Sequence, residues 1–520
     1  MSLAKKRPSL TVFAMIAATL FSKFFGMVRG MIMAWTLADS LSAVAFTAAY
    51  RIPGAIFDFL LSAAILGCFI PAYGKARAES EKTARVFSAS FLCAVTVIAA
   101  LLSLAGIIFA PAVISVSSPG ISPEAAAVAS SLLRIMFPMM IFAALAYTLT
   151  GILQSERNFI LPALISSVSN IFIITYLVIA GADFNVYTLS FVYVISWFIQ
   201  FLTLCIPLAV TGKFPISRPD MSDKYLRLSL KNAPNIMASS WFGPASILIA
   251  AFFSSFVSDT AFVTYDYSIG IYTIIAGVTV YGVGNYVFPS LSALCAEGKT
   301  AEFQLAVKKS LFAMLLIAIP IFSASFTLSY EGTALLYLRG SFSEELALAC
   351  ARSLSILSIA MPAYAVSEIL YRAFFAAGKV GIPARAACIA IAVGIVSNAL
   401  LLLFGCGRDS VSISYTIAQW THTAVLFAYS VKHFSPVSEK KDIVSFIKLG
   451  LCALFSILST SFLAHIVPVF TSFGQTISLL FKITIVFILA FMIYLLCIYL
   501  MGFLPRSQRK EVKNIDEKSA

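Results

Sequence analysis

The sequence contains few charged residues for its length. Of its 520 residues, only 11% are Asp, Glu, Lys or Arg, whereas 60% are hydrophobic. A soluble domain carries roughly 25% charged residues, which cover its surface. The composition therefore excludes an ordinary soluble protein and predicts a chain whose surface faces lipid.

Patterns for metal binding and disulfide bonding are also missing. The nine cysteines are odd in number and scattered, without a Cys-x-x-Cys pair, and the three histidines are far apart. This spacing argues against a zinc site or a disulfide framework. We expect the cysteines to be small apolar side chains within helices, and we expect no cofactor.

Motifs of covalent chemistry are absent as well. The sequence has no P-loop, no HExxH motif and no GxSxG motif, so we expect neither an ATPase nor another enzyme. The formal net charge of +13 raises the question of nucleic-acid binding. Because the basic residues lie in short segments between apolar stretches, they are typical of topology signals, and we expect no nucleic-acid partner.

Long apolar stretches make up most of the chain. A membrane-spanning helix needs about 20 mostly apolar residues, and about fourteen such stretches can be placed. We predict helices near residues 8–36, 41–73, 85–113, 130–152, 158–181, 186–211, 227–256, 261–293, 304–328, 344–376, 381–405, 410–431, 444–468 and 477–503. The predicted fold class is an all-α polytopic membrane protein.

The connections between these stretches alternate in charge. Both ends of the chain and the even-numbered connections are basic, whereas the odd-numbered ones carry almost no Lys or Arg apart from Arg339 and Arg408. Cytoplasmic loops are enriched in Lys and Arg. We therefore predict a multi-pass protein with both termini in the cytoplasm.

Two pairs of similar segments indicate an internal repeat. Residues 69–71 and 287–289 end the second and eighth predicted helices, and residues 160–162 and 381–383 open the fifth and eleventh, at nearly equal spacing. Paired repeats commonly flank a substrate site in transporters. We predict a first six-helix lobe at 1–215, a second at 216–435, two further helices at 436–504 and a basic tail at 505–520.

Charged residues inside the predicted spans are candidates for function, because each costs at least about 2.5–3.5 kcal/mol at the centre of a span. They are Lys23, Arg29, Arg51, Asp58, Arg134, Asp266, Arg352, Glu368 and Lys482. Arg134, Asp266 and Lys482 lie near predicted helix ends and can extend to the membrane surface. Glu368 can pair with Arg372 one turn further on.

The first two helices hold the strongest candidates. Lys23 lies near the middle of the first helix, and Arg29 lies about 9 Å further along and about 120° around it. Arg51 and Asp58 share one face of the second helix, about 10 Å apart. These residues indicate a hydrated cationic cavity that binds phosphate or pyrophosphate. Ion pairs between helices are the structural alternative.

The same region resembles a known family. The similarity is to motifs of the MurJ (MviN) lipid II flippases, of the multidrug/oligosaccharidyl-lipid/polysaccharide exporter superfamily. It is carried by residues 21–29, 45–46, 51–53, 69–71, 287–292, 371–379 and 382–383, and by Pro234, Ser254 and Tyr267. The resemblance implies two six-helix lobes in pseudo-twofold repeat around a cationic cavity, with a lipid-tail groove at the last two helices. It also implies alternating access, which carries undecaprenyl-pyrophosphate-linked peptidoglycan precursor (lipid II) to the outer leaflet of the bacterial cytoplasmic membrane for cell-wall synthesis.

The resemblance also implies site residues. Lys23, Arg29 and Arg51 match the basic residues thought to hold the pyrophosphate. We take Asp58, Asp266, Arg352 and Asn398 as further polar or coupling candidates. At several positions the family usually has a charged residue that this sequence lacks or replaces with the opposite charge. The residues at these positions are Gly30, Val44, Phe57, Asp58, Ile269, Gly270 and Thr273. The predicted cavity therefore carries less charge than is usual in the family.

The driving force and some alternative functions stay open. The seventh and eleventh helices contain no carboxylate for the sodium site proposed in some members. Membrane potential, which acts at about 2.3 kcal/mol per charge per 100 mV, is the alternative driver. The other functions are a flippase for another undecaprenyl-pyrophosphate-linked saccharide, a non-transporting membrane scaffold and a drug exporter. The expected partners are lipid II, membrane lipids and cell-wall synthesis proteins.

Overall fold

A computed structural model of the chain describes residues 8–38, 40–434, 440–469 and 474–503. Every regular element in these ranges is helical. The predicted tail at 505–520 lies outside them.

The α-helices are α1 (Pro8–Leu37), α2 (Leu41–Phe57), α3 (Ala63–Glu79), α4 (Glu81–Ile108), α5 (Ala110–Ser117), α6 (Pro123–Met136), α7 (Met139–Ser155), α8 (Ile160–Ala180), α9 (Val186–Val210), α10 (Lys224–Ser240), α11 (Phe242–Ser255), α12 (Asp259–Ala296), α13 (Thr300–Thr327), α14 (Ser329–Tyr337), α15 (Glu344–Ser358), α16 (Met361–Ala376), α17 (Gly381–Leu403), α18 (Ser410–Phe434), α19 (Lys440–Ile466) and α20 (Gln475–Leu500).

Each predicted span coincides with one α-helix or with two consecutive ones. A π-helical turn, η1 (Asp58–Ser62), joins α2 to α3, and two short 3₁₀ segments are η2 (Gly181–Asp183) and η3 (Gly407–Asp409). By length and composition, eight helices within the described ranges can cross a membrane, or up to eleven if each bent pair forms one span. The fold is therefore that of a multi-pass helical membrane protein.

Three of the predicted spans are bent where a proline interrupts them. The bends are 41° between α6 and α7, 54° between α10 and α11, and 45° between α15 and α16. Pro138 precedes α7, Pro362 lies in the first turn of α16, and Pro244 lies near the start of α11. Proline lacks an N–H donor and is tolerated in the first turn of a helix, which explains why a new helix begins at each of these places.

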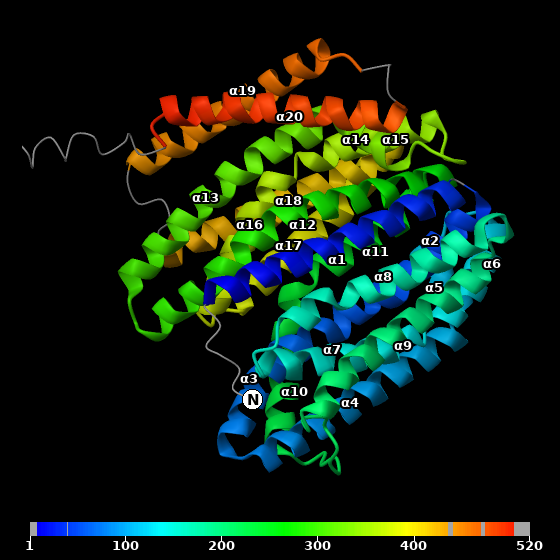
Figure 1. Cartoon of the computed structure of the whole chain (residues 1–520), viewed down its shortest axis with the longest axis vertical. Coiled ribbons are helices and arrows are strands. Elements are labelled where there is room, and N and C mark those ends of the chain that lie inside the picture. The colour runs from blue at the N-terminus through cyan, green and yellow to red at the C-terminus, as the bar shows by residue number, and fades with distance from the viewer. Residues whose placement is uncertain (1–7, 39, 435–439, 470–473, 504–520) are drawn as a thin grey trace, which may run out of the picture.

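The helices form two groups with a third layer at one side (Figure 1). Helices α1 to α9 lie together, α11 to α18 lie beside them, and α19 and α20 lie along the outer edge of the second group. One buried apolar cluster is built mainly from residues 37–226 and another from residues 287–434. Helix α10 contacts both α3 and α17, so it connects the two groups.

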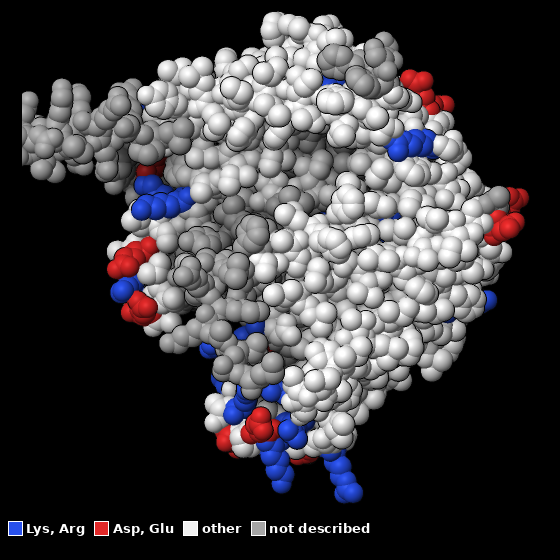
Figure 2. Space-filling model, viewed as in Figure 1, with Lys and Arg blue, Asp and Glu red and all other residues white. Residues whose placement is uncertain are grey.

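Charged side chains gather at the edges of the molecule. Figure 2 shows a broad face almost without charge, with Lys and Arg concentrated near the ends of α3, α4 and α10. Such an apolar belt between charged edges is what a surface in contact with lipid requires.

Helices α19 and α20 are held to α13 and α14 by polar contacts. Lys482 forms an ion pair of 2.8 Å with Glu331, and both side chains are buried. Lys308 pairs with Asp442, and the Tyr494 hydroxyl donates to the Leu316 carbonyl at 3.0 Å. The expectation that Lys482 reaches the membrane surface is therefore wrong, because Glu331 neutralises it inside the protein. The predicted Glu368–Arg372 pair is confirmed.

Removing Glu331 should destabilise the docking of α20. Glu331→Ala leaves the Lys482 ammonium buried without its partner, which costs about 3–5 kcal/mol for pairs of this kind. We expect a clear drop in the Tm of the detergent-solubilised protein. The measurement is the amount of protein that stays in the native peak in size-exclusion chromatography after heating to a series of temperatures.

The double variant Glu331→Gln/Lys482→Gln is the control, since it removes both charges and should regain most of the lost Tm. An unchanged Tm in Glu331→Ala would show that this ion pair does not hold α20 in place.

Candidate functional site

The two ends of the helices differ in charge, and both ends are closed by contacts between the two groups. We call the end that carries the connections near residues 75–85, 213–231 and 299–309 the basic end, and the other the opposite end. The candidate residues lie between these ends, so the contacts at each end define what encloses the site.

At the opposite end, hydrogen bonds join the first group of helices to the second. The Tyr267 hydroxyl donates to the Ala38 carbonyl at 3.0 Å, and the Gly120 amide donates to Ser255 Oγ at 3.1 Å. The Ser122 amide donates to the Asp259 carboxylate at 3.4 Å. We call this set of contacts the opposite-end seam.

Trp35 extends the same seam. Its indole N–H donates to the Leu336 carbonyl at 3.2 Å, and the Ser341 hydroxyl donates to the Trp35 carbonyl at 2.8 Å. Gly340 has a positive φ of 60°, and a Cβ added there would lie 2.9 Å from the Trp35 carbonyl oxygen. Only glycine fits both the backbone conformation and the close approach.

Arg51 and Asp266 form an ion pair between the two groups of helices, close to the opposite-end seam. The Arg51 guanidinium contacts the Asp266 carboxylate and also donates to its carbonyl at 3.4 Å. The Tyr50 hydroxyl donates to the same carboxylate at 3.4 Å. Both charged side chains are only 13% exposed. Asp266 is thus paired with α2 rather than extended to the membrane surface, and Arg51 pairs with α12 rather than with Asp58 or α1.

Lys23 and Arg29 lie deeper in the molecule on α1. The Arg29 guanidinium carbon lies 5.8 Å from the centre of the Tyr193 ring, within the range of a cation–π contact. Its Nε is buried and has no hydrogen-bond partner in the described part of the chain, where Arg29 also forms no ion pair. The Lys23 side chain is largely buried and lies close enough to experience the charge of Arg29. The two cations therefore share one region.

Asp58 begins the π-helical turn η1 that joins α2 to α3. Its carboxylate is partly buried beside Ser62 and forms no ion pair with any described residue. Single π-turns inside α-helices frequently occur at functional sites, because they change the direction of the side chains that follow. Asp58 therefore gives the second predicted span an acidic group at a position where the resemblance described above implies a basic one.

Aromatic and ionic contacts close the basic end. The rings of Phe59 and Trp241 are stacked at 4.6 Å, and the Trp241 indole N–H donates to the Phe59 carbonyl at 3.0 Å. Nearer the surface, Glu79 accepts from Lys224 at 2.7 Å and from Tyr225 at 2.7 Å. These hydrogen bonds lower the pKa of the exposed Glu79 carboxyl below its usual value. These contacts therefore join α3 and the turn before it to α10.

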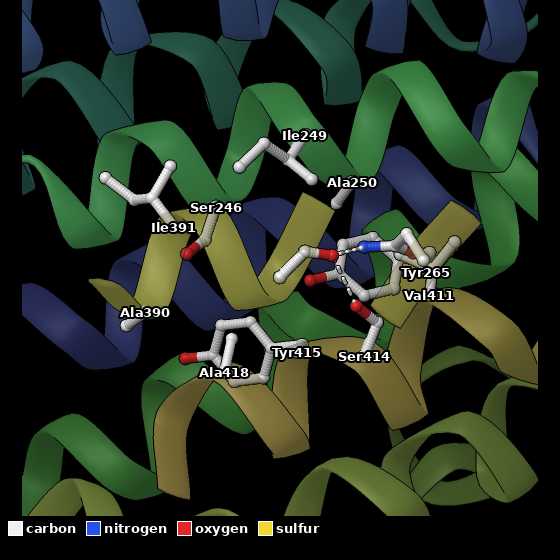
Figure 3. A pocket seen from close by; sticks show the side chains of 12 residues that line it. Ser246, Ile249, Ala250, Tyr265, Ala390, Ile391, Val411, Ser414, Tyr415 and Ala418 are labelled. Atoms are coloured by element: carbon white, nitrogen blue, oxygen red, sulfur yellow. Dashed lines mark hydrogen bonds between the residues drawn. The ribbon is translucent and has the colours of Figure 1, made fainter. Parts of the chain in front are cut away.

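Asn398 lies in a small cavity among α11, α12, α17 and α18. Ser246, Tyr265 and Tyr415 surround this cavity from three of the helices (Figure 3), and its volume is about 20 Å³. Asn398 Nδ2 donates to the Gly394 carbonyl at 2.9 Å, and its Oδ1 has no partner among the described residues. A cavity of this size holds about one water, and no carboxylate lines it.

The remaining candidate, Arg352, lies apart from the others. Its side chain is 74% exposed and pairs with Asp409 at 2.6 Å. Within the described ranges, no cluster of three or more His, Cys, Asp or Glu side chains could hold a metal ion. The structure therefore brings together Lys23 and Arg29, and separately Arg51 and Asp266, and leaves Arg352 at the surface.

Sequence reasoning missed the residues that close the basic end. Phe59 and Trp241 read as ordinary apolar residues, Lys75 as a basic residue of a connection, and Asn232 and Asn235 only as polar side chains of the seventh predicted helix. The available signal was two amides one turn apart in α10 (Lys224–Ser240), a segment with an unusually polar composition for a spanning helix.

These features define a multi-pass helical membrane protein whose ionisable side chains are enclosed between two groups of helices, as in membrane transporters. A family model described as "Lipid II flippase MurJ" matches residues 33–486. The chain belongs to this family, which confirms the resemblance found in its motifs.

Curated relatives agree along nearly the whole chain. A probable lipid II flippase MurJ from Buchnera aphidicola subsp. Schizaphis graminum is 22% identical over 499 residues, covering 93% of this chain and 95% of that protein. One from Rhizobium meliloti is 26% identical over 439 residues, covering 82% of this chain and 80% of that protein.

Solved structures show the same fold. A lipid II flippase MurJ in an inward closed conformation aligns with a TM-score of 0.77 at 20% identity, covering 93% of this chain and 98% of that one. An inward-facing multidrug resistance MATE family transporter of the MOP superfamily aligns with a TM-score of 0.65 at 13% identity, covering 82% and 98%. The helical arrangement is therefore shared beyond the flippases.

Proposed function

We propose that this protein carries lipid II from the inner to the outer leaflet of a bacterial cytoplasmic membrane by alternating access. The observation that supports this most directly is the pair of partly buried cations on α1, Lys23 and Arg29, in a member of the lipid II flippase family. A partly buried guanidinium that forms no ion pair with a described residue suits an anionic ligand that arrives during the transport cycle. No covalent step is part of this proposal.

The architecture that we propose has fourteen spans with both termini in the cytoplasm. The basic end then faces the cytoplasm, in agreement with the enrichment of Lys and Arg in cytoplasmic loops. Residues 1–215 and 216–435 form two six-helix lobes in pseudo-twofold repeat. Residues 436–504 add two helices, whose exposed apolar surface suits the lipid tail. The opposite-end seam then closes the outward side.

The headgroup pyrophosphate would lie between Lys23, Arg29 and Arg51. Lys23 and Arg29 both supply positive charge from α1, and Arg51, which Asp266 holds, supplies it from α2. A phosphate group competes with a carboxylate for the same guanidinium donors. Binding of the substrate would therefore draw Arg51 away from Asp266 and weaken the contact that keeps the outward side closed.

Coupling to an ion is not part of the proposal. The small cavity at Asn398 is mostly apolar, and its polar lining consists of hydroxyl groups and one amide without a carboxylate. Membrane potential can act directly on the charged headgroup at about 2.3 kcal/mol per charge per 100 mV, and it is the driver that we propose.

The test of this function is rescue of a bacterium depleted of its own lipid II flippase. Expression of the wild-type chain should restore growth and the appearance of lipid II in the outer leaflet, at a verified level of protein in the membrane. A well-inserted chain that fails to restore either would contradict the lipid II assignment. A flippase for another undecaprenyl-pyrophosphate-linked saccharide or a scaffold would then be the remaining candidates.

A further inference from the structure

A cavity of about 260 Å³, whose lining is mostly apolar with four polar side chains, lies between α3 and α10 at the basic end. Its lining includes Lys75 and Pro71 from α3, Ser229, Asn232 and Asn235 from α10, and Val380 from the connection before α17. At about 30 Å³ per water, it has room for roughly nine waters. We call it the α3–α10 cavity.

The polar groups of this cavity have hydrogen-bonding capacity to spare. The Ser229 hydroxyl is buried and has no partner in the described part of the chain. The side chains of Lys75, Asn232 and Asn235 are exposed to the cavity or its mouth, and none takes part in a hydrogen bond or ion pair recorded among the described residues. Two amides, a hydroxyl and an ammonium group are therefore available to a ligand.

The cavity is separate from the central cations. At its inner side the Phe59 and Trp241 rings are stacked, and a Cβ added to Gly67 would lie 2.6 Å from the Ile236 side chain. Helices α3 and α10 thus touch between the cavity and the middle of the protein. A ligand in the cavity cannot contact Arg29 until this barrier opens.

We propose that the α3–α10 cavity is a waiting site for the glycopeptide part of the lipid-linked headgroup. This inference rests on the proposed function. Asparagine side chains match the hydroxyl and amide groups of an N-acylated amino sugar and a peptide, since each asparagine amide both donates and accepts hydrogen bonds. Lys75 at the mouth suits a peptide carboxylate.

The size of the cavity limits what it holds. It lies just below the range of roughly 300–1,000 Å³ for ligand pockets, so it accommodates one sugar ring or a short peptide arm, and the rest of the headgroup stays in the open mouth. With one lysine and no arginine in its lining, it is a poorer site for pyrophosphate than the region of Lys23 and Arg29. The two regions therefore recognise different parts of one substrate.

The experiment compares ligands with and without the glycopeptide. The purified full chain in nanodiscs is titrated with lipid II, with undecaprenyl pyrophosphate and with the soluble glycopeptide, and binding is followed by native mass spectrometry. In Asn232→Leu/Asn235→Leu, we expect affinity for lipid II to fall about tenfold, as for the loss of two hydrogen bonds. Affinity for undecaprenyl pyrophosphate should stay unchanged.

Two further variants sharpen the result. Asn232→Asp conserves shape and adds a negative charge, so it should weaken binding of lipid II through its peptide carboxylates. Asn158→Leu is the matched control, because Asn158 is exposed in a connection at the same end and does not line the cavity. It should bind like wild type.

The outcomes separate this inference from the proposed function. Equal affinity of wild type and both cavity variants for lipid II would overturn the waiting site and leave the flippase function standing. Failure of the wild type to bind either lipid would overturn both. Tight binding of the soluble glycopeptide, lost in the double variant, would support the site and show that it needs no lipid anchor. Loss of undecaprenyl pyrophosphate binding in the double variant would contradict the assignment to the glycopeptide.

Discussion

We expect Arg29→Ala to abolish rescue of a strain depleted of its lipid II flippase, with the variant present in the membrane at the wild-type level. Truncating one partner of a buried charge pair costs about 2–5 kcal/mol, which corresponds to a loss of about thirtyfold or more in substrate binding or transport rate. The cation–π contact with Tyr193 holds the guanidinium in place, so its removal deletes a positioned group rather than a mobile one. Outer-leaflet lipid II and growth are the measurements.

Two matched variants make this result specific. Arg29→Lys keeps the charge and loses the planar fork of donors, so it should rescue partly. Arg352→Ala removes an arginine that is 74% exposed and paired with Asp409, so it should rescue fully. Complete rescue by Arg29→Ala would refute the phosphate contact on α1, even if the wild-type chain flips lipid II.

We expect Asp266→Asn to open the outward side of the protein. The substitution leaves Arg51 partly buried and without its carboxylate, at a cost of about 3–5 kcal/mol for a pair of this kind. Opening the seam lets water reach the guanidinium and relieves that cost, so the equilibrium shifts toward the outward-open state. The measurement is oxidative crosslinking of Ser122→Cys with Asp259→Cys in a background without native cysteines. These positions face each other across the opposite-end seam, and Asp266→Asn should lower the yield.

The charge-swapped variant Arg51→Asp/Asp266→Arg tests the cause of this effect. If the ion pair closes the seam, the swap should recover crosslinking, while it should still impair transport because α2 has lost its cation. Asp409→Asn breaks a pair of the same type at the surface and should leave the yield unchanged. A crosslinking yield that does not respond to Asp266→Asn would show that the hydrogen bonds of the seam suffice to hold it closed.

Much of the fold follows from the sequence because lipid restricts the choice of structure. A chain whose backbone must satisfy its own hydrogen bonds in hydrocarbon forms helices, and each predicted span coincides with one or two of them. The breaks were not predicted. Pro138, Pro244 and Pro362 are visible in the sequence, but a proline within an apolar stretch can give a kink, a new helix or neither, according to what packs around it.

The sequence picks out single charged residues within the spans but not their partners. Lys23 and Arg29 were identified as candidates because a charge within a span is costly. This reasoning does not require knowing which residue each of them contacts. The partners of Arg51 and Lys482 were not found, since Asp266 and Glu331 lie more than a hundred residues away along the chain. Periodicity along one helix carries no information about which distant helix faces it.

The ion pair between Lys482 and Glu331 also bears on how the chain is made. Glu331 leaves the ribosome about 150 residues before Lys482, which at about 5–20 residues per second is a delay of roughly 8–30 s. During that interval α14 enters the membrane with a carboxyl group and without the lysine that will neutralise it. Docking of the last helix is therefore the step that neutralises Glu331 on α14. A chain truncated before α20 should be recognised and degraded, even though every residue of the two lobes is present.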